Sequence, residues 1–349
     1  MVSFPAHPDD VTPQWLGEVL DAEVRSVSWK PIGTGQVGDS VRFTLEADGA
    51  PRTLAGKFPA ADAASRGTAI MFGLYRKEVE FYRQTAPHLE VRVPNVHFAD
   101  VSEDGGEFIL LFEDVGPARQ GDQIAGCGIE DARHAMRQAA AIHAPSWGRE
   151  DLLQAAWIQP PASLGETIAG LYPQAQAVFR ERYADSLEPE LMRICEELAE
   201  AAPIWFHRTE PPKCIVHGDF RLDNMLFDIG GGAEPIAVLD WQTVTIGNAL
   251  TDVAYFMGCG IGEKLWRDNE DELLDLWLAE MTAHGVELTR EEVWDDYRRG
   301  VLHGVSTAVF SAAFVERTAR GDDNFLSMAR GSCSLALARD SIGALKETI

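Results

Sequence analysis

The pattern of apolar positions changes from strand-like to helix-like about a third of the way along the chain. Near the N-terminus, Thr12 followed by Pro13 predicts the capped start of a short helix over residues 9–20. Alternating apolar and polar residues then predict strands, and the fully apolar run in 107–115 indicates a strand that is buried on both faces. The expected strands cover residues 24–29, 41–45, 53–58, 95–101 and 107–115. These strands predict a small five-stranded sheet.

From about residue 130 onward, apolar residues recur mostly at helical spacing. The first of these helices is expected to end before Pro145 and carries His143 on its apolar face, where a hydrogen-bonded core histidine is favoured over a catalytic one. Further helices are expected at residues 164–183, 188–208, 251–259, 270–284, 290–318 and 323–345, and one helix is expected earlier, among the strands, at residues 68–83. A strand-rich beginning is therefore followed by a mainly helical remainder.

Composition narrows the classes of function. With 349 residues the chain suits two lobes that share a cleft. Acidic residues outnumber basic ones 55 to 30, and this excess opposes the phosphate contacts on which nucleic-acid binding depends. No apolar run is long enough for membrane insertion, and a soluble, cytoplasmic protein is expected. The cysteines never form a C-x-x-C pair, so free thiols are expected rather than zinc ligands: Cys127, Cys195, Cys214, Cys259 and Cys333.

The chemistry is concentrated in the segment from 214 to 257. A polar loop, His217-Gly-Asp-Phe-Arg-Leu-Asp-Asn224, follows one apolar run, and a second apolar run delivers Asp240 and Trp241. Phosphoryl transfer uses one carboxylate as a base and further oxygen ligands for magnesium. We therefore assign Asp219 as the base and Asn224 and Asp240 as Mg²⁺ ligands. The alternative is that Asp219 is a turn residue and Asp240 a strand-end cap.

The motifs Val216-His-Gly-Asp-Phe-Arg-Leu-Asp-Asn224 and Leu239-Asp-Trp-Gln242, with Asp252 downstream, resemble those of aminoglycoside phosphotransferase and choline kinase-like small-molecule kinases. The residues of these motifs are most similar to those of the ecdysteroid kinase-like branch. The resemblance implies an α+β, protein-kinase-like, two-lobed fold, with a small antiparallel sheet in the N-lobe and a larger, mainly helical C-lobe. It places the nucleotide-binding lobe at residues 1–115 and the catalytic and acceptor-binding lobe at 116–349. It also implies Mg²⁺-dependent transfer of phosphate from ATP, or GTP, to a hydroxyl group of a small molecule.

The predicted nucleotide site begins with a cation at the end of an apolar strand. Lys57 requires an anionic partner there, and the resemblance favours Glu78 over Glu80, with the ammonium group aimed at the nucleotide phosphates. Gly33, Gly35 and Gly38 have the G-x-G-x-x-G spacing, which fits either a phosphate-covering hairpin or an ordinary turn.

By resemblance, the carbonyl of Glu113 and the amide of Val115 bind adenine. Asp252 braces the catalytic loop, and His217 orients it.

The acceptor is expected to be a small molecule, because only Trp241 to Thr251 separate Asp240 from the next helix. A bulky, partly apolar alcohol is favoured, and an aminoglycoside is possible. Residues 261–300 contain 12 acidic and 5 basic residues, which indicates a solvated face or, alternatively, a site for a polycation. Arg221 and Asp223 are expected to form a mutual salt bridge. The rival functions are a nucleotide-binding pseudokinase that acts as a scaffold or regulator, and a protein kinase.

Overall fold

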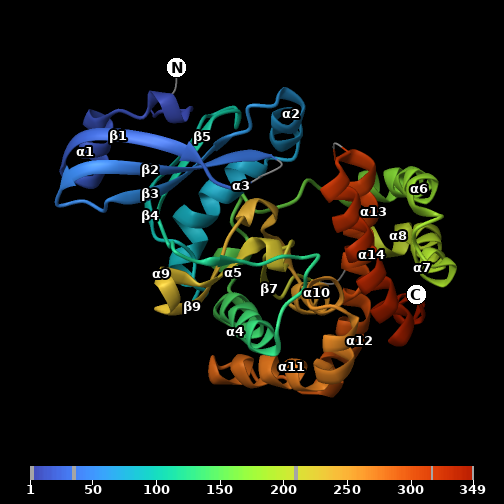
Figure 1. Cartoon of the computed structure of the whole chain (residues 1–349). Helices are drawn as coiled ribbons and strands as arrows, with labels where there is room; N and C mark the ends of the chain where they lie inside the picture. Colours follow the sequence, from blue (N-terminus) through green and yellow to red (C-terminus); the bar gives the residue numbers. More distant parts are fainter. Residues whose placement is uncertain (1–3, 34–36, 208–210, 316, 348–349) are drawn as a thin grey trace. The chain divides into compact units, whose positions relative to one another are not determined.

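The computed structural model describes residues 4–33, 37–207, 211–315 and 317–347 (Figure 1). The chain forms two compact units. Unit 1 comprises residues 1–118 and 228–244, and unit 2 comprises residues 119–227 and 245–349. Within the described ranges, no helix has the length and apolar character needed to cross a membrane.

Unit 1 is built on a five-stranded antiparallel sheet with the strand order β1-β2-β3-β5-β4. This confirms the expected small sheet. In the register, Lys57 lies opposite Ser40 on one neighbouring strand and Leu110 on the other, so it belongs to the central strand. The strands are β1 (Glu23–Pro31), β2 (Gly38–Asp48), β3 (Thr53–Pro59), β4 (Val96–Val101) and β5 (Phe108–Glu113).

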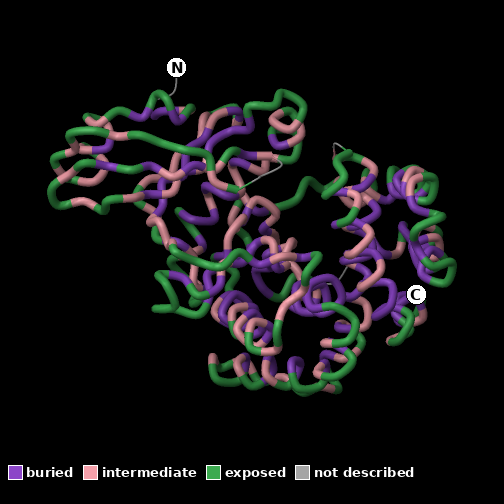
Figure 2. The backbone as a smooth tube through the Cα atoms, in the orientation of Figure 1, coloured by how far each residue is buried: buried purple, intermediate pink, exposed green. Residues whose placement is uncertain are grey.

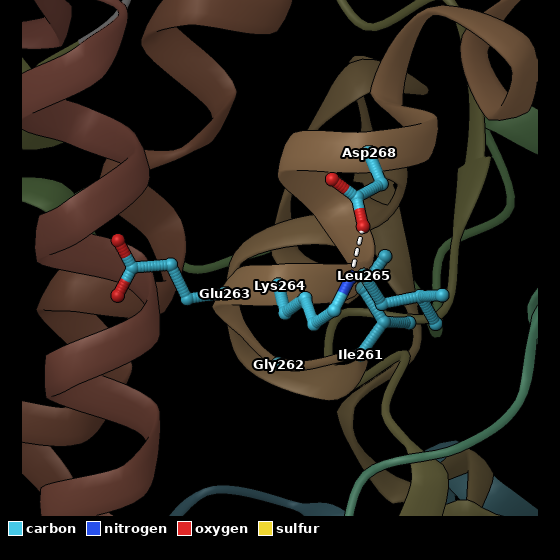
Figure 3. Close-up of a pocket in the computed structure, with 6 residues that line it drawn as sticks. All are labelled: Ile261, Gly262, Glu263, Lys264, Leu265 and Asp268. Carbon is cyan, nitrogen blue, oxygen red and sulfur yellow. Dashed lines mark hydrogen bonds and ion pairs between the residues drawn. The ribbon is translucent and has the colours of Figure 1, made fainter.

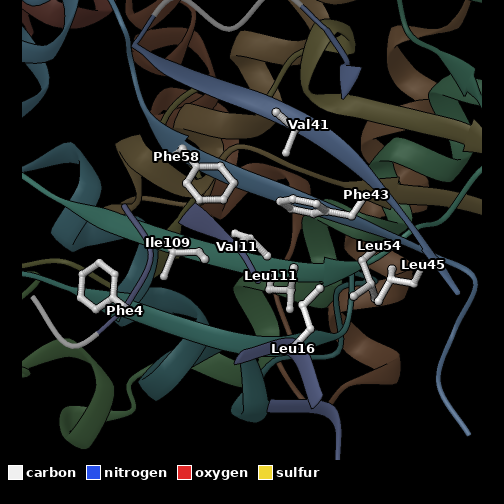
Figure 4. Close-up of a cluster of buried hydrophobic side chains, with 10 residues drawn as sticks. All are labelled: Phe4, Val11, Leu16, Val41, Phe43, Leu45, Leu54, Phe58, Ile109 and Leu111. Carbon is white, nitrogen blue, oxygen red and sulfur yellow. The ribbon is translucent and has the colours of Figure 1, made fainter. Parts of the chain in front are cut away.

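An apolar core lies between this sheet and the N-terminal segment, including α1 (Pro13–Leu20) (Figure 4). The hydroxyl of Thr12 accepts a hydrogen bond of 3.1 Å from the Trp15 amide, which confirms the expected helix cap. Every second residue of β2 points into the core, as the period of a strand requires. The cluster consists of Phe4, Val11, Leu16, Val41, Phe43, Leu45, Leu54, Phe58, Ile109 and Leu111.

The single helix expected over residues 68–83 is wrong. Gly73 has a φ of 64°, a conformation that favours glycine, and it separates α2 (Ala63–Met71) from α3 (Leu74–Glu80). The chain continues from α3 into the π-helical turn η2 (Phe81–Thr85). The other elements of unit 1 are η1 (Pro8–Asp10), η3 (Ala86–His88), α9 (Ile229–Gly232), β9 (Glu234–Val238) and η5 (Trp241–Thr243).

Unit 2 is mainly helical, and with the antiparallel sheet of unit 1 it confirms the predicted α+β class. Its helices are α4 (Ile129–Ser146), α5 (Glu150–Leu153), α6 (Leu164–Tyr183), α7 (Pro189–Glu200), α8 (Ala202–Phe206), α10 (Leu250–Tyr255), α11 (Glu263–Ala283), α12 (Arg290–Gly300), α13 (Leu302–Phe314), α14 (Ala319–Ala338) and α15 (Ser341–Lys346). Short elements accompany them: β6 (Arg119–Gln120), β7 (Cys214–Val216), η4 (Leu222–Asn224), β8 (Met225–Asp228), β10 (Thr245–Gly247) and η6 (Phe256–Gly260).

Several helix boundaries in unit 2 differ from the expected ones. Helix α4 passes Pro145, which falls in the last turn, where the Ser146 hydroxyl donates to the carbonyl of Ile142 at 2.9 Å. The ranges 188–208, 290–318 and 323–345 are each divided into two helices. The last break lies at Asp340, whose φ of 48° ends the helical path. A periodic apolar pattern continues across such breaks and does not reveal them.

Helix α10 and the following turn η6 are buried at every residue from Asp252 to Gly260 (Figure 2). Two of its side chains, those of Asp252 and Tyr255, contact the loop that carries the predicted base.

Candidate active site

The loop of residues 217–224, which carries the predicted base and is called the catalytic loop below, begins where β7 ends and is anchored by a buried carboxylate. Asp252 on α10 accepts hydrogen bonds from the main-chain amides of His217, at 2.7 Å, and Gly218, at 3.0 Å. This confirms the bracing expected for Asp252. The Nδ1 atom of His143 accepts from the indole of Trp277 at 3.2 Å, so its Nε2–H donates to Asp252, also at 3.2 Å. His143 is therefore a core histidine, as predicted.

Burial raises the pKa of Asp252. The hydrogen bond and electrostatic attraction of His143, together with the main-chain hydrogen bond from His217, outweigh this effect and hold the pKa below the usual aspartate value. The carboxylate is consequently an anion at neutral pH, which strengthens its bonds to the two loop amides.

The predicted base, Asp219, is surrounded by donors. Arg221 Nε lies 2.9 Å from Oδ1 and 3.1 Å from Oδ2, the Tyr255 hydroxyl donates to Oδ1 at 2.8 Å, and Asn224 Nδ2 donates to Oδ2 at 2.9 Å. Burial disfavours the charge of Asp219, but Arg221 and the other donors lower its pKa below the usual range. Each oxygen already has two of these contacts, with the Nε–H of Arg221 shared between both oxygens, and the side chain is still 21% exposed, so a further hydroxyl can reach it.

Asn224 is held in one orientation by Asp219. Its amide nitrogen donates to the main-chain oxygen of Asp219 at 2.8 Å as well as to the carboxylate. Because the amide group is planar, its carbonyl oxygen faces the other way. An oxygen ligand presented in this manner suits Mg²⁺.

Arg221 joins Asp219 to a second carboxylate. Its Nη1 lies 2.7 Å from Asp223 Oδ2, which confirms the salt bridge expected between these two residues. The other oxygen of Asp223 accepts a hydrogen bond of 2.9 Å from the main-chain amide of Gln123 and lies 3.8 Å from Arg320 at the start of α14. The contact between Arg221 and the predicted base was not expected from the sequence.

In unit 1, Lys57 lies between two carboxylates. Its ammonium group contacts Glu78 at 2.7 and 2.9 Å and Asp240 at 2.9 Å. The predicted choice of Glu78 over Glu80 is confirmed, since Glu80 instead accepts from Gln84 at 2.7 Å. Burial lowers the pKa of Lys57, but the two carboxylates raise it further, so the amine stays charged at neutral pH.

Asp240 occupies a left-handed turn, with a φ of 62°, directly after β9. The next residue, Trp241, stacks on Phe81 with ring centroids 3.8 Å apart, and its amide donates to Glu78. One aromatic contact therefore ties the turn that carries Asp240 to the helical segment that carries Glu78. One oxygen of Asp240 binds Lys57, and the second has a long contact of 3.5 Å with Gln242.

The remaining predicted nucleotide contacts also belong to unit 1. Gly33 has a φ of 74°, which favours glycine, and Gly35 lies outside the described residues. A Cβ atom at Gly38 would lie 3.3 Å from Cε of Lys57 and 3.2 Å from the main-chain oxygen of Phe58, so a larger residue would fit tightly against the lysine.

At the predicted hinge, the Glu113 side chain contacts Arg92 at 2.6 Å, and the Val115 carbonyl accepts from Gly230 at 2.9 Å. Binding of adenine by Glu113 and Val115 stays a prediction.

The site residues thus fall into two sets. Lys57, Glu78 and Asp240 meet within unit 1, and Asp219 and Asn224 meet within unit 2. Convergence of all these groups on one nucleotide stays a prediction. Among the described residues, no group of three or more His, Cys, Asp or Glu side chains forms a metal cluster, but the predicted ligands are one carboxylate and one amide oxygen, which together suit Mg²⁺.

Two contacts of the catalytic loop were missed by the sequence reasoning. Tyr255 lies three residues after Asp252 and hence on the same side of α10, and this spacing is the signal that could have identified it. His303 on α13 donates through Nε2 to the Gly218 carbonyl at 2.8 Å, and its ring packs edge-on against Tyr255. No local sequence pattern indicates a contact between two residues that are 85 positions apart.

The acidic segment 261–300 contains many internal ion pairs. Arg290 contacts Asp271 and Asp275, and the buried Glu270 accepts from Tyr297 at 2.7 Å. A pocket of about 380 Å³ lies at the start of α11 (Figure 3), where Lys264 pairs with Asp268. Its lining is Ile261, Gly262, Glu263, Lys264, Leu265 and Asp268, none of which is a predicted site residue.

Comparison with known proteins gives a consistent family. The sequence profile of the family described as "APH: Phosphotransferase enzyme family" matches residues 29–299. Acyl-CoA dehydrogenase family member 10 of Mus musculus is 45% identical over 83 residues, which are 24% of this chain and 8% of that protein. Family member 11 of Homo sapiens is 52% identical over 68 residues, again 8% of its length. The matched segments are therefore a small part of these relatives.

Solved structures with low sequence identity share the fold. The GDP complex of the F108L mutant of aminoglycoside 2'-phosphotransferase-IIIa has a TM-score of 0.53 at 16% identity, with 91% of this chain and 93% of that chain covered. Choline kinase from Cryptosporidium parvum Iowa II has a TM-score of 0.56 at 12% identity, with 94% and 92% covered. The fold is thus that of aminoglycoside phosphotransferases and choline kinases.

Proposed function

This chain belongs to the APH phosphotransferase enzyme family and is a small-molecule kinase, and we propose that it transfers the γ-phosphoryl group of ATP or GTP to a hydroxyl of a bulky, partly apolar alcohol. Residues 1–115 form the nucleotide-binding lobe in this proposal, and residues 116–349 bind the acceptor and carry the base. The ecdysteroid kinase-like branch is compatible with the family match. The five free thiols support a reducing compartment such as the cytoplasm.

The observation that carries the proposal is the setting of Asp219. An ionised carboxylate is held by Arg221, Tyr255 and Asn224 in a loop that Asp252 anchors from behind. A turn residue needs no such set of donors. A fixed anion that remains 21% exposed is suited to accept a hydrogen bond from an attacking alcohol.

In the proposed reaction, the oxygen of the acceptor bonds to the γ-phosphorus while its proton passes to Asp219. The bond from the γ-phosphorus to the bridging oxygen breaks, and ADP or GDP leaves. Lys57, kept charged by Glu78 and Asp240, is assigned to the nucleotide phosphates. Bound Mg²⁺ supplies positive charge that offsets the charge of the phosphate oxygens. Asn224 and Asp240 are the residues assigned to hold it, and Gly33, Gly35, Gly38, Glu113 and Val115 are assigned to the nucleotide.

Several features support an apolar acceptor over a polycation. Four of the 12 acidic residues in segment 261–300 are already paired with Arg290, Arg267 or Lys264. Two of the curated relatives are named for acyl-CoA dehydrogenation, so an acyl-CoA that carries a hydroxyl group belongs among the candidate acceptors.

A panel of acceptors tests this proposal. Consumption of ATP and of GTP is measured with Mg²⁺ and with sterol-like alcohols, aliphatic alcohols, hydroxyacyl-CoA, choline and kanamycin, and the phosphorylated product is identified by mass spectrometry. We expect a phosphate ester of an apolar alcohol. Turnover of kanamycin or choline alone would reject the apolar acceptor. The absence of any nucleotide turnover would reject the proposed phosphotransferase reaction.

A further inference from the structure

Helix α13 has one exposed face, and that face begins at the catalytic loop. His303, Thr307, Phe310 and Phe314 follow one another at intervals of four, three and four residues, so they form a single stripe along the helix. The other positions of α13 are mostly buried, because α14, α6 and α10 pack around it. The stripe ends in a phenyl ring that is 53% exposed. We call these four residues the α13 stripe.

Two contacts place the catalytic loop alongside this stripe. At one end His303, itself a member of the stripe, donates to the carbonyl of Gly218, the residue before Asp219. At the other end Arg320, in the first turn of α14 just beyond α13, lies 3.8 Å from Asp223. The loop therefore meets α13 at His303 and the start of α14 at Arg320, and its two carboxylates, Asp219 and Asp223, lie close together because both contact Arg221.

Apolar side chains are exposed on α13 and next to Gln123, a residue that contacts the loop. The Phe310 and Phe314 rings contact each other with centroids 4.6 Å apart. Ile124, 43% exposed, follows Gln123, whose amide donates to Asp223. Large apolar side chains left exposed together commonly mark binding sites. Only Thr307 adds a hydroxyl to the middle of the stripe.

From these observations we propose that the α13 stripe binds the body of the acceptor, which is an elongated apolar alcohol whose hydroxyl lies at Asp219 and whose chain or ring system lies against Phe310 and Phe314. The proposal rests on the proposed phosphotransferase function and adds where and how the acceptor is recognised. With a rise of 1.5 Å per residue, Phe310 lies about 10 Å and Phe314 about 16 Å along the helix from His303. An acceptor must therefore extend about 10 Å beyond its hydroxyl to gain the first of these contacts.

The stripe also disfavours the alternative class of acceptor. A polycation is bound through several carboxylates, whereas the half-exposed residues of the stripe carry no carboxylate. The carboxylates of the loop itself, Asp219 and Asp223, are already engaged by Arg221.

A series of primary alcohols tests the proposal. The ratio kcat/KM is measured with Mg²⁺ and ATP for ethanol, butanol, hexanol, octanol and decanol, with kanamycin as the polar comparison. We expect kcat/KM to rise about two- to fourfold for each added methylene once the chain is long enough to reach Phe310. The F310A variant is expected to lower the decanol-to-ethanol ratio of kcat/KM about tenfold, and F314A is expected to lower it less, because Phe314 lies at the far end of a ten-carbon chain.

Leu337→Ala is the matched control. Leu337 is an apolar residue near the end of α14 that is 47% exposed and does not belong to the stripe. This variant is expected to keep the wild-type ratio, and thermal unfolding verifies that all three variants are folded.

Two results overturn the proposal while leaving the phosphotransferase function intact. One is turnover of ethanol or kanamycin with no gain for longer alcohols, and the other is the same decanol-to-ethanol ratio in F310A, F314A and the wild type. If no acceptor is phosphorylated and no ATP is consumed, the proposed function itself fails, and the proposal fails with it.

Discussion

Replacing Tyr255 by phenylalanine removes one hydroxyl group and hardly changes the volume of the side chain. In the structure this hydroxyl donates to Asp219 Oδ1 at 2.8 Å from a fully buried ring. A hydrogen bond to a charged group contributes about 1.5–3 kcal/mol, and 1.36 kcal/mol corresponds to a tenfold change in rate. Since Arg221 and Asn224 still hold the carboxylate, we expect the activation free energy to rise by the lower end of this range, which corresponds to a loss of about tenfold in kcat.

The assay separates this role from a loss of stability. Steady-state kcat and KM for ATP are measured with an accepted alcohol, or from slow ATP hydrolysis, and KM for ATP is expected to stay unchanged because Tyr255 is not among the residues assigned to the nucleotide. Tyr297→Phe is the control. The Tyr297 hydroxyl, also fully buried, donates at 2.7 Å to Glu270, which is paired with Arg339 just as Asp219 is paired with Arg221.

Both variants are expected to lower the melting temperature by a similar amount, and only Tyr255→Phe is expected to lower kcat. Equal kcat values for the two variants would refute the positioning of Asp219 by Tyr255.

Two further predictions concern the buried charges. Glu78→Gln leaves Lys57 with Asp240 alone, and we expect at least about a tenfold loss in kcat/KM for ATP. Glu80→Gln, two residues further on, is expected to have the wild-type value, and equal losses would contradict the assignment of Glu78. Asp252→Asn is expected to lower the free energy of unfolding by about 3 kcal/mol at pH 7, because it removes a buried carboxylate that His143 and two amides require. Since folding lowers the pKa of Asp252, its stabilisation is complete above the unfolded value of about 3.9 and is lost as the pH falls below it, so the difference between variant and wild type in urea titrations should shrink towards pH 3. A difference that does not depend on pH would contradict this prediction.

Much of the site could be predicted because its residues lie in short motifs with clear chemical requirements. A lysine at the end of an apolar strand needs an anionic partner, and Glu78 supplies it. The bracing by Asp252 followed from the resemblance to small-molecule kinases. The salt bridge between Arg221 and Asp223 was predicted, but the contact of Arg221 with Asp219 was not. That second contact depends on the path of the loop backbone, which turns at Gly218 with a φ of 81°.

The contacts that were missed come from tertiary packing. His303 reaches Gly218 only because α13 packs beside α10, and no periodicity in the sequence encodes that neighbour. The same limit applies to helix ends. The break at Gly73 was missed because apolar periodicity continues through it, although a glycine within a helical pattern is a known signal of such a turn.

The central claim is that Asp219 is the base of a phosphotransferase, and Asp219→Asn tests it most directly. The variant keeps the shape of the side chain and a hydrogen-bonding oxygen but cannot accept the proton of an alcohol as a carboxylate does. We predict a fall in kcat of about 10² to 10⁴, with ATP affinity retained in a direct binding measurement. Equal rates of nucleotide turnover in Asp219→Asn and the wild type would contradict the account and favour a nucleotide-binding scaffold.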